Sequence, residues 1–202
     1  MALVLGITGG VGTGKSTVLK MLGKLGAQVL SADDVAREIV AKGSPAYAEI
    51  VERFGKGMVA PNGEIDRAAL AEIVFRDEQA LPELERITHP RIIATMRERI
   101  EEFRRSAGTR RAVMAVEIPL LYECGLEEMV DEALLVAAEQ RTQMDRLRDR
   151  AGMTRAEAIR RIEAQMPLES KVSRADRVIW NDGDLESLER SVERIWGEII
   201  LL

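Results

Sequence analysis

Apolar residues occur along this chain in two patterns, as short uninterrupted runs and as longer stretches with helical spacing. Between the runs, apolar residues recur every three or four positions, which predicts amphipathic helices. Because predicted strands and helices alternate, we expect an α/β fold with a parallel sheet and right-handed crossover connections. The runs predict strands at residues 3–7, 27–30, 111–118 and 133–137, and a last short strand within 173–181.

Residues 43–108 contain no clear strand and carry apolar patterns of helical spacing instead. Turn-forming residues near Pro45 and Pro61 separate these patterns, and Asp66 is a predicted helix cap. One predicted helix ends before His89-Pro90 and another begins after it. In related α/β folds, a helical block inserted between strands usually carries the second substrate. By this fold-level analogy, we expect residues 43–108 to do the same.

The segment between the first predicted strand and the next helix matches the phosphate-loop spacing G-x-x-x-x-G-K-[ST], with residues 9–16 reading GGVGTGKS. Glycines let backbone N–H groups turn toward phosphate oxygens, and the helix N-terminus adds partial positive charge. We expect Lys15 to reach the β- and γ-phosphates and the Ser16 hydroxyl to bind Mg²⁺. A chance glycine-rich turn is disfavoured because both flanking elements are present. The candidate ATP ligands here are Gly10, Val11, Gly12, Thr13, Gly14, Lys15, Ser16 and Thr17.

Acidic residues follow two of the predicted strands. Asp33 and Asp34 come after the second strand, and Glu117 lies at the end of the third. Ligands of open α/β sheets bind at the carboxyl ends of strands, so these carboxylates are candidates for the site. Either aspartate could instead cap the helix that begins there. Glu117 could hold magnesium through water, or be a partly buried acid paired with a loop cation.

An arginine-rich segment, residues 139–166, follows the fourth predicted strand. A capping box at Thr154 and Glu157 predicts two helices that meet near Gly152. Interspersed acidic residues are typical of solvated helical faces, which accounts for most of the arginines. The functional interpretation is a lid that closes over the triphosphate.

Composition narrows the function classes. The 202 residues carry a net charge of −5, which gives no general basic surface for nucleic acid. Cys124 is the only cysteine, so an internal disulfide is excluded, and its apolar neighbours predict a packed thiol. The only histidine, His89, precedes a proline and is more typical of a structural or pocket-lining residue than of a general base. Without a leader or a membrane-spanning stretch, we expect a cytoplasmic protein with no membrane partner.

Taken together, the motifs resemble the dephospho-CoA kinase family. The phosphate loop alone defines only a superfamily, and the combination of motifs at these separations is more specific. The family transfers the γ-phosphate of ATP to the ribose 3′-hydroxyl of dephospho-CoA, the last step of coenzyme A synthesis. Beyond the loop, the resemblance rests on Ala32-Asp33 with Arg37, His89-Pro90, Pro119-Leu120-Leu121-Tyr122-Glu123, Gln143 with Arg146 and Arg150, Gln165, and the segment from Ala175 to Gly183 that contains Asn181.

The resemblance implies a single-domain, three-layer P-loop kinase fold. Its core would comprise about 1–35, 110–139 and 173–202, with a helical acceptor-binding insertion at about 36–109 and a helical lid at about 140–170.

The resemblance also implies roles for individual residues. Asp33 is the implied catalytic base, with Lys15 and Arg146 as further catalytic residues. Arg150 and Asn181 would bind the nucleotide, Asn181 near the adenine. The implied acceptor-side residues are Thr8, Asp33, Arg37, His89, Leu120 and Glu123.

This chain departs from the family pattern at two positions. It has Ser31-Ala32-Asp33 where Asp-Ala-Asp is usual, so a second carboxylate near the magnesium is missing or is supplied by Glu117. It also has Arg91 after His89-Pro90 where leucine is usual.

Two alternatives to this function stay open. One is another P-loop small-molecule kinase, of the nucleoside monophosphate or shikimate type. The other is a GTP-binding switch protein, against which the missing N-K-x-D guanine motif argues. For the favoured reading, the expected partners are the small molecules ATP and dephospho-CoA.

Overall fold

The computed structural model describes residues 2–77, 79–107 and 112–201, apart from the side chains of Phe75, Arg150 and Ala151. The chain divides into two units. One unit comprises Met1–Ser31 and Ile100–Leu202, and the other comprises Ala32–Arg99.

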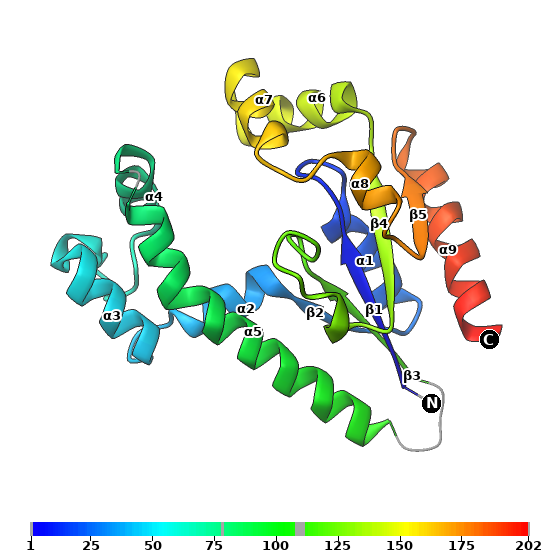
Figure 1. The fold of residues 1–202 in the computed structure, drawn as a ribbon, viewed down its shortest axis with the longest axis horizontal. Helices are drawn as coiled ribbons and strands as arrows, with labels where there is room; N and C mark the ends of the chain where they lie inside the picture. Colours follow the sequence, from blue (N-terminus) through cyan, green and yellow to red (C-terminus); the bar gives the residue numbers. More distant parts are fainter. Residues whose placement is uncertain (1, 78, 108–111, 202) are drawn as a thin grey trace. The chain divides into compact units, whose positions relative to one another are not determined.

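The first unit contains a five-stranded sheet in the order β2-β3-β1-β4-β5, with each strand parallel to its neighbours (Figure 1). This confirms the predicted α/β fold with a parallel sheet. Glu117, the last residue of β3, pairs with Ile7 of β1 and with Ser31 of β2. The carboxyl ends of these three strands therefore meet at one edge. The strands are β1 (Ala2–Thr8), β2 (Gln28–Ser31), β3 (Ala112–Glu117), β4 (Glu132–Ala137) and β5 (Arg177–Trp180).

One face of the sheet is covered by α1 (Lys15–Lys24) and α9 (Leu185–Leu201), which also contact each other (Figure 1). Leu22 of α1 and Val192 of α9 are buried with Ile7 in one apolar cluster. Both helices follow the apolar spacing of the sequence, so their apolar faces are the ones that leave water. This packing fixes the start of α1, where the phosphate loop ends.

Three helices connect β4 to β5: α6 (Gln140–Ala151), α7 (Arg155–Glu163) and α8 (Leu168–Val172). Gly152 ends α6 in the left-handed conformation, at φ 61°. The predicted capping box is confirmed, because the Thr154 hydroxyl accepts from Glu157 N and the Glu157 carboxylate accepts from Thr154 N. The predicted pair of helices meeting near Gly152 is therefore confirmed as well.

The second unit is helical, with α2 (Ala32–Ile39), α3 (Pro45–Phe54), α4 (Arg67–Arg76) and the greater part of α5 (Ala80–Ser106). Ile50, Leu70 and Ile87 belong to its own apolar core. Asp66 caps α4 as predicted, accepting from the amides of Ala68 and Ala69. The one pairing of extended residues described in this unit is the bridge between Val59 and Ile65.

The prediction of two helices on either side of His89-Pro90 was wrong, because α5 runs through both residues. Proline lacks the N–H that would bond four residues back, and its ring crowds that carbonyl. Pro90 is exposed, whereas Ile87 and Met96 are buried at 3% and 1% exposure. Burial of the apolar residues on both sides of Pro90 outweighs the local cost.

The expectation of a packed Cys124 thiol was also wrong, because Cys124 is exposed. Its neighbours Leu121, Tyr122 and Leu126 are buried. They turn inward from the loop after β3 and leave Cys124 at the surface.

In the part of the chain that the structure describes, none of the helices has both the length and the apolar character to cross a bilayer.

Candidate functional site

The phosphate loop joins the end of β1 to the start of α1, at the carboxyl edge of the sheet. Gly14 stands at the N-cap of α1 in the left-handed conformation, with φ 98°. A Cβ on Gly14 would lie 2.5 Å from the Asn181 amide nitrogen. Both the backbone conformation and the close neighbour therefore require glycine at this position.

Two side chains of the loop fold back onto its own backbone. Lys15 Nζ donates to the Gly10 carbonyl at 2.8 Å, and the buried Thr13 hydroxyl donates to the same carbonyl at 2.9 Å. These contacts stabilise the loop in one conformation and hold the ammonium group against it. Thr17 follows in the first turn of α1, where its amide donates to the Gly14 carbonyl.

Ser16 and Glu117 come together beside the loop. The Ser16 hydroxyl donates to Glu117 Oε1 at 2.9 Å, and Glu117 is 3% exposed. The described residues contain no cluster of three or more His, Cys, Asp or Glu side chains that could enclose a metal. A hydroxyl and a carboxylate nevertheless suit Mg²⁺, which often takes one or two protein oxygens and completes its shell with water and phosphate oxygens.

Asn181 and Arg146 contact the loop from outside. The Asn181 amide donates to the Thr13 carbonyl at 2.7 Å, and Asn181 is buried. Arg146 donates to the carbonyls of Thr13 and Gly12 at 3.4 and 3.5 Å and to Asn181 Oδ1 at 3.4 Å. These three contacts are long for hydrogen bonds. A cation thus lies beside the phosphate loop.

Two glutamines of the predicted lid segment also lie at the loop. Gln165 Oε1 accepts from the Val11 amide at 2.8 Å. A Cβ on Gly10 would lie 2.9 Å from Gln143 Oε1, and Gln143 itself donates to the Ala138 carbonyl. Both glutamines belong to the motifs that suggested the family, but no specific role was predicted for either.

The loop after β3 is tied to the segment that precedes α8. Glu123 Oε1 accepts from Met166 N at 3.2 Å and pairs with Lys171 Nζ at 2.7 Å. Burial of Glu123 acts to raise its pKa, but the contact with Lys171 and the Met166 amide outweigh burial and lower that pKa. Lys171 is 1% exposed, and sequence reasoning missed it because nothing in its short helix distinguishes it from a surface lysine.

Other predicted acceptor-side residues of the first unit lie near the same turn. The Thr8 hydroxyl donates to the Pro119 carbonyl at 3.4 Å, at the end of β1. Leu120 is half-buried, and its carbonyl accepts from Cys124 N. The predicted nucleotide ligand Arg150 belongs to α6, but its side chain lies outside the described residues.

Asp33, Arg37 and His89 belong to the second unit. Helix α2 begins at Ala32, so Asp33 and Asp34 lie inside its first turn rather than at its cap. Arg37 donates to Asp34 at 2.8 Å, and both side chains are exposed. His89 is half-buried within α5. The structure pairs Arg37 with Asp34 and leaves Asp33 exposed to solvent, while the roles of these residues stay predictions.

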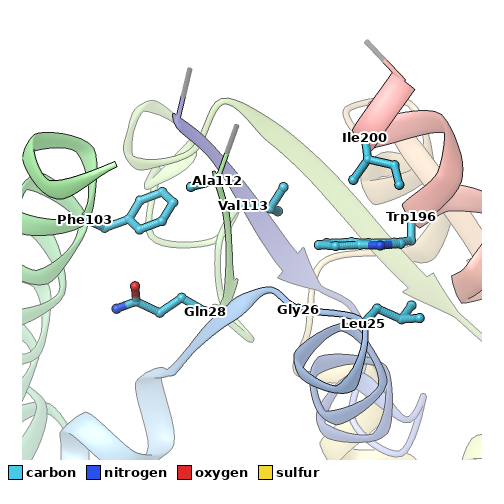
Figure 2. Close-up of a pocket in the computed structure, with 8 residues that line it drawn as sticks. All are labelled: Leu25, Gly26, Gln28, Phe103, Ala112, Val113, Trp196 and Ile200. Carbon is cyan, nitrogen blue, oxygen red and sulfur yellow. The ribbon is translucent and has the colours of Figure 1, made fainter. Parts of the chain in front are cut away.

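A cavity of about 510 Å³ opens at the other edge of the sheet, near the amino ends of β2 and β3 (Figure 2). Trp196, Phe103 and Gln28 project into it. Its volume is in the range of ligand sites. None of the described residues that line the cavity carries a charge or belongs to the phosphate loop. The candidate active site is therefore the one at the carboxyl edge of the sheet.

The fold and the loop define a class. A glycine-rich loop between the first strand and the first helix, on a parallel sheet of this strand order, is a P-loop nucleotide-binding architecture of the small-molecule-kinase type.

A sequence model of dephospho-CoA kinase matches residues 3–187, and the chain belongs to the dephospho-CoA kinase family. The chain is 45% identical over 195 residues to a dephospho-CoA kinase of Geobacter sulfurreducens, covering 96% of this chain and 98% of that protein. The solved structure of TT1252 from Thermus thermophilus has a TM-score of 0.75 at 37% identity, covering 98% of this chain and 97% of the other. A dephospho-CoA kinase from Campylobacter jejuni has a TM-score of 0.74 at 27% identity, covering 98% of both chains. Family membership makes the chain an ATP-dependent kinase.

Proposed function

We propose that this chain carries out its family's reaction by holding ATP on the loop from Gly9 to Ser16 and using Asp33 to orient the acceptor hydroxyl. The reaction forms a bond between the ribose 3′-oxygen of dephospho-CoA and the γ-phosphorus. It breaks the bond from that phosphorus to the β,γ-bridging oxygen, giving CoA and ADP. The observation that supports the nucleotide half is the preformed loop, with Lys15 held on the Gly10 carbonyl.

In this proposal the loop amides from Gly12 onward and the N-terminus of α1 bind the phosphate oxygens, while the Val11 amide keeps its hydrogen bond to Gln165. Lys15 leaves the Gly10 carbonyl for the β- and γ-phosphates, which exchanges a neutral acceptor for charged ones. Arg146 lies beside the carbonyls of Gly12 and Thr13, and from there its guanidinium is proposed to stabilise the charge of the transferred phosphoryl group. Arg150 and Asn181 are proposed to complete the nucleotide side.

We propose that Ser16 holds Mg²⁺ and that Glu117 holds it directly or through water. The fit rests on the paired oxygens of these two residues, 2.9 Å apart, and on the burial of Glu117. When bound, the ion would neutralise charge that develops on the β- and γ-phosphate oxygens.

On the acceptor side, Asp33 accepts the proton of the 3′-hydroxyl and orients the oxygen for in-line attack. Its exposure and its position in the first turn of α2 leave the carboxylate able to meet a substrate. Arg37, His89 and Leu120 are proposed to contact the acceptor, together with Thr8 and Glu123. Phosphoryl transfer depends mainly on positioning and charge stabilisation, so these contacts carry most of the acceptor specificity.

An acceptor screen tests the proposal. The protein is incubated with ATP, Mg²⁺ and either dephospho-CoA, AMP or shikimate, and ADP release is followed. We expect release with dephospho-CoA at least about a hundredfold faster than with the others, since a site built for polar groups rejects analogues that lack them. If AMP or shikimate were phosphorylated as fast as dephospho-CoA or faster, the chain would instead be a kinase of the nucleoside monophosphate or shikimate type. A parallel titration with GTP tests the switch-protein alternative.

We further propose that the protein works in the cytoplasm on small molecules, without a nucleic-acid or membrane partner. The net charge of −5 supports the first exclusion. Fractionation of cells followed by the ADP-release assay would check the location.

A further inference from the structure

Lys171 is a buried charge that the reaction described above does not use. Its side chain is 1% exposed, on the short helix α8, which packs against β4 (Figure 1). Burying an ammonium group costs free energy unless a partner compensates for it. The described partner is Glu123, whose side chain is 20% exposed. An apolar residue of similar size would fill this position at lower cost, so stability alone does not account for a lysine here.

The contacts of Glu123 lead from Lys171 toward the phosphate loop. Glu123 Oε1 accepts from the backbone N–H of Met166 as well as pairing with Lys171. Met166 directly follows Gln165, whose side chain accepts from the Val11 amide at 2.8 Å. The Glu123 carboxylate thus fixes the backbone beside Gln165, a glutamine of the predicted lid that is hydrogen-bonded to the loop.

We propose that Lys171 is a positioning residue for nucleotide binding: through Glu123 and the Met166 backbone, it keeps Gln165 on the Val11 amide and the phosphate loop in its binding conformation. The proposal rests on the proposed function in one respect, that the loop binds ATP. Holding the loop in its bound form reduces the ordering cost of binding, so the effect falls on ATP affinity.

The test is the affinity for ATP with Mg²⁺, measured by isothermal titration calorimetry without an acceptor. The variants are Lys171→Met, Gln165→Ala and their combination, with Lys24→Met as the matched control at an exposed position of α1. We expect each of the first two to weaken binding about three- to tenfold, the worth of one hydrogen bond, and the control to change nothing. Because Lys171 acts through Gln165, the combination should be no more than about twofold weaker than Gln165→Ala alone.

A double variant without charge at either position, Lys171→Met with Glu123→Gln (the charge-free pair), separates an effect on protein stability from an effect on the position of Gln165. This variant leaves no buried ion without its partner, so we expect its melting temperature to stay close to that of the wild type. Its ATP affinity should still fall about three- to tenfold. In the kinetics of the single variant Lys171→Met, which keeps Glu123, the KM for ATP should rise while kcat at saturating ATP and dephospho-CoA changes less than twofold.

Wild-type ATP affinity in Lys171→Met or in the charge-free pair would overturn the proposal. Multiplying effects in the combination would also overturn it, because they would mean that Lys171 and Gln165 act independently. A failure of the proposed function looks different, since the wild type would then bind ATP without phosphorylating dephospho-CoA, or would not bind ATP at all.

Discussion

Asp33 is the residue to which we assign the proton-accepting role. Substitution by asparagine keeps the size of the side chain but removes the proton acceptor. We expect Asp33→Asn to lower kcat by about a hundredfold to ten-thousandfold, the usual range for general-base assistance. ATP affinity should stay within about twofold, because the loop is untouched. Steady-state kinetics and calorimetry check both values, and wild-type turnover would show that another group accepts the proton.

Lys15 carries the matching prediction on the nucleotide side. Its ammonium group rests on the Gly10 carbonyl and is proposed to move to the phosphates. Lys15→Ala removes a charged donor, so ATP affinity should fall about ten- to a hundredfold and turnover should fall with it. Lys20→Ala, at an exposed position of α1, is the control. Normal ATP binding by Lys15→Ala would contradict the role of the loop.

The pKa of Glu123 predicts a pH dependence of stability. Its folded-state pKa is lowered from the ordinary value of 4.5, so the folded state favours the ionised carboxylate. The resulting stabilisation is complete above about pH 5 and is lost as the pH falls through the folded-state value. Melting temperatures should therefore fall less steeply below about pH 4.5 in Glu123→Gln than in the wild type. Parallel curves for the two proteins would show that Glu123 makes no such contribution.

At the scale of elements, α5 shows where local sequence signals and packing disagree. A proline inside a helix lowers the free energy of unfolding by up to about 3 kcal/mol. Part of this loss is offset because proline also restricts the conformations of the unfolded chain. We expect Pro90→Ala to raise the free energy of unfolding by about 1–2 kcal/mol, measured by urea denaturation. Pro45→Ala is the matched control, because proline is favoured at the first turn of α3. An unchanged or lower value for Pro90→Ala would mean that the proline makes a compensating contact.

Most elements were predictable because each has a local cause. The strands followed from apolar runs, and the ends of α4 and α7 followed from Asp66 and Thr154, whose caps the structure confirms. The continuity of α5 was not predictable, because it depends on the burial of Ile87 and Met96 in packing that no short window contains. The exposure of Cys124 was not predictable for the same reason: its apolar neighbours are buried in the fold, while Cys124 itself lies at the surface.

At the scale of the whole molecule, ligand binding and folding are coupled. ATP that binds only the folded protein stabilises it by about 2.7 kcal/mol at a hundred times its dissociation constant. Both tryptophans, Trp180 and Trp196, lie in the unit that holds the phosphate loop. Tryptophan fluorescence during thermal unfolding should thus shift to higher temperature with ATP and Mg²⁺. The shift should be much smaller in Lys15→Ala, and an equal shift there would place the nucleotide elsewhere.

The sequence by itself determined the fold class and predicted the nucleotide half of the site. A phosphate loop is contiguous: its glycines act through backbone geometry, and its lysine and serine act through side chains whose positions the same eight residues specify. The same holds for the alternation of strands and helices, which local periodicity encodes. The family motifs then reduced the possible acceptors of the kinase to one, dephospho-CoA.

Only the tertiary structure decided which distant side chains meet the loop. Ser16 and Glu117 are 101 positions apart in the chain, and Val11 and Gln165 are 154 apart. Glu117 lies beside Ser16 because the register of β1 and β3 aligns their carboxyl ends. Nothing in the sequence distinguishes Lys171 from a surface lysine, and only the folded structure shows that it is buried against Glu123. Such pairings depend on strand order and packing, which are properties of the whole chain rather than of any segment.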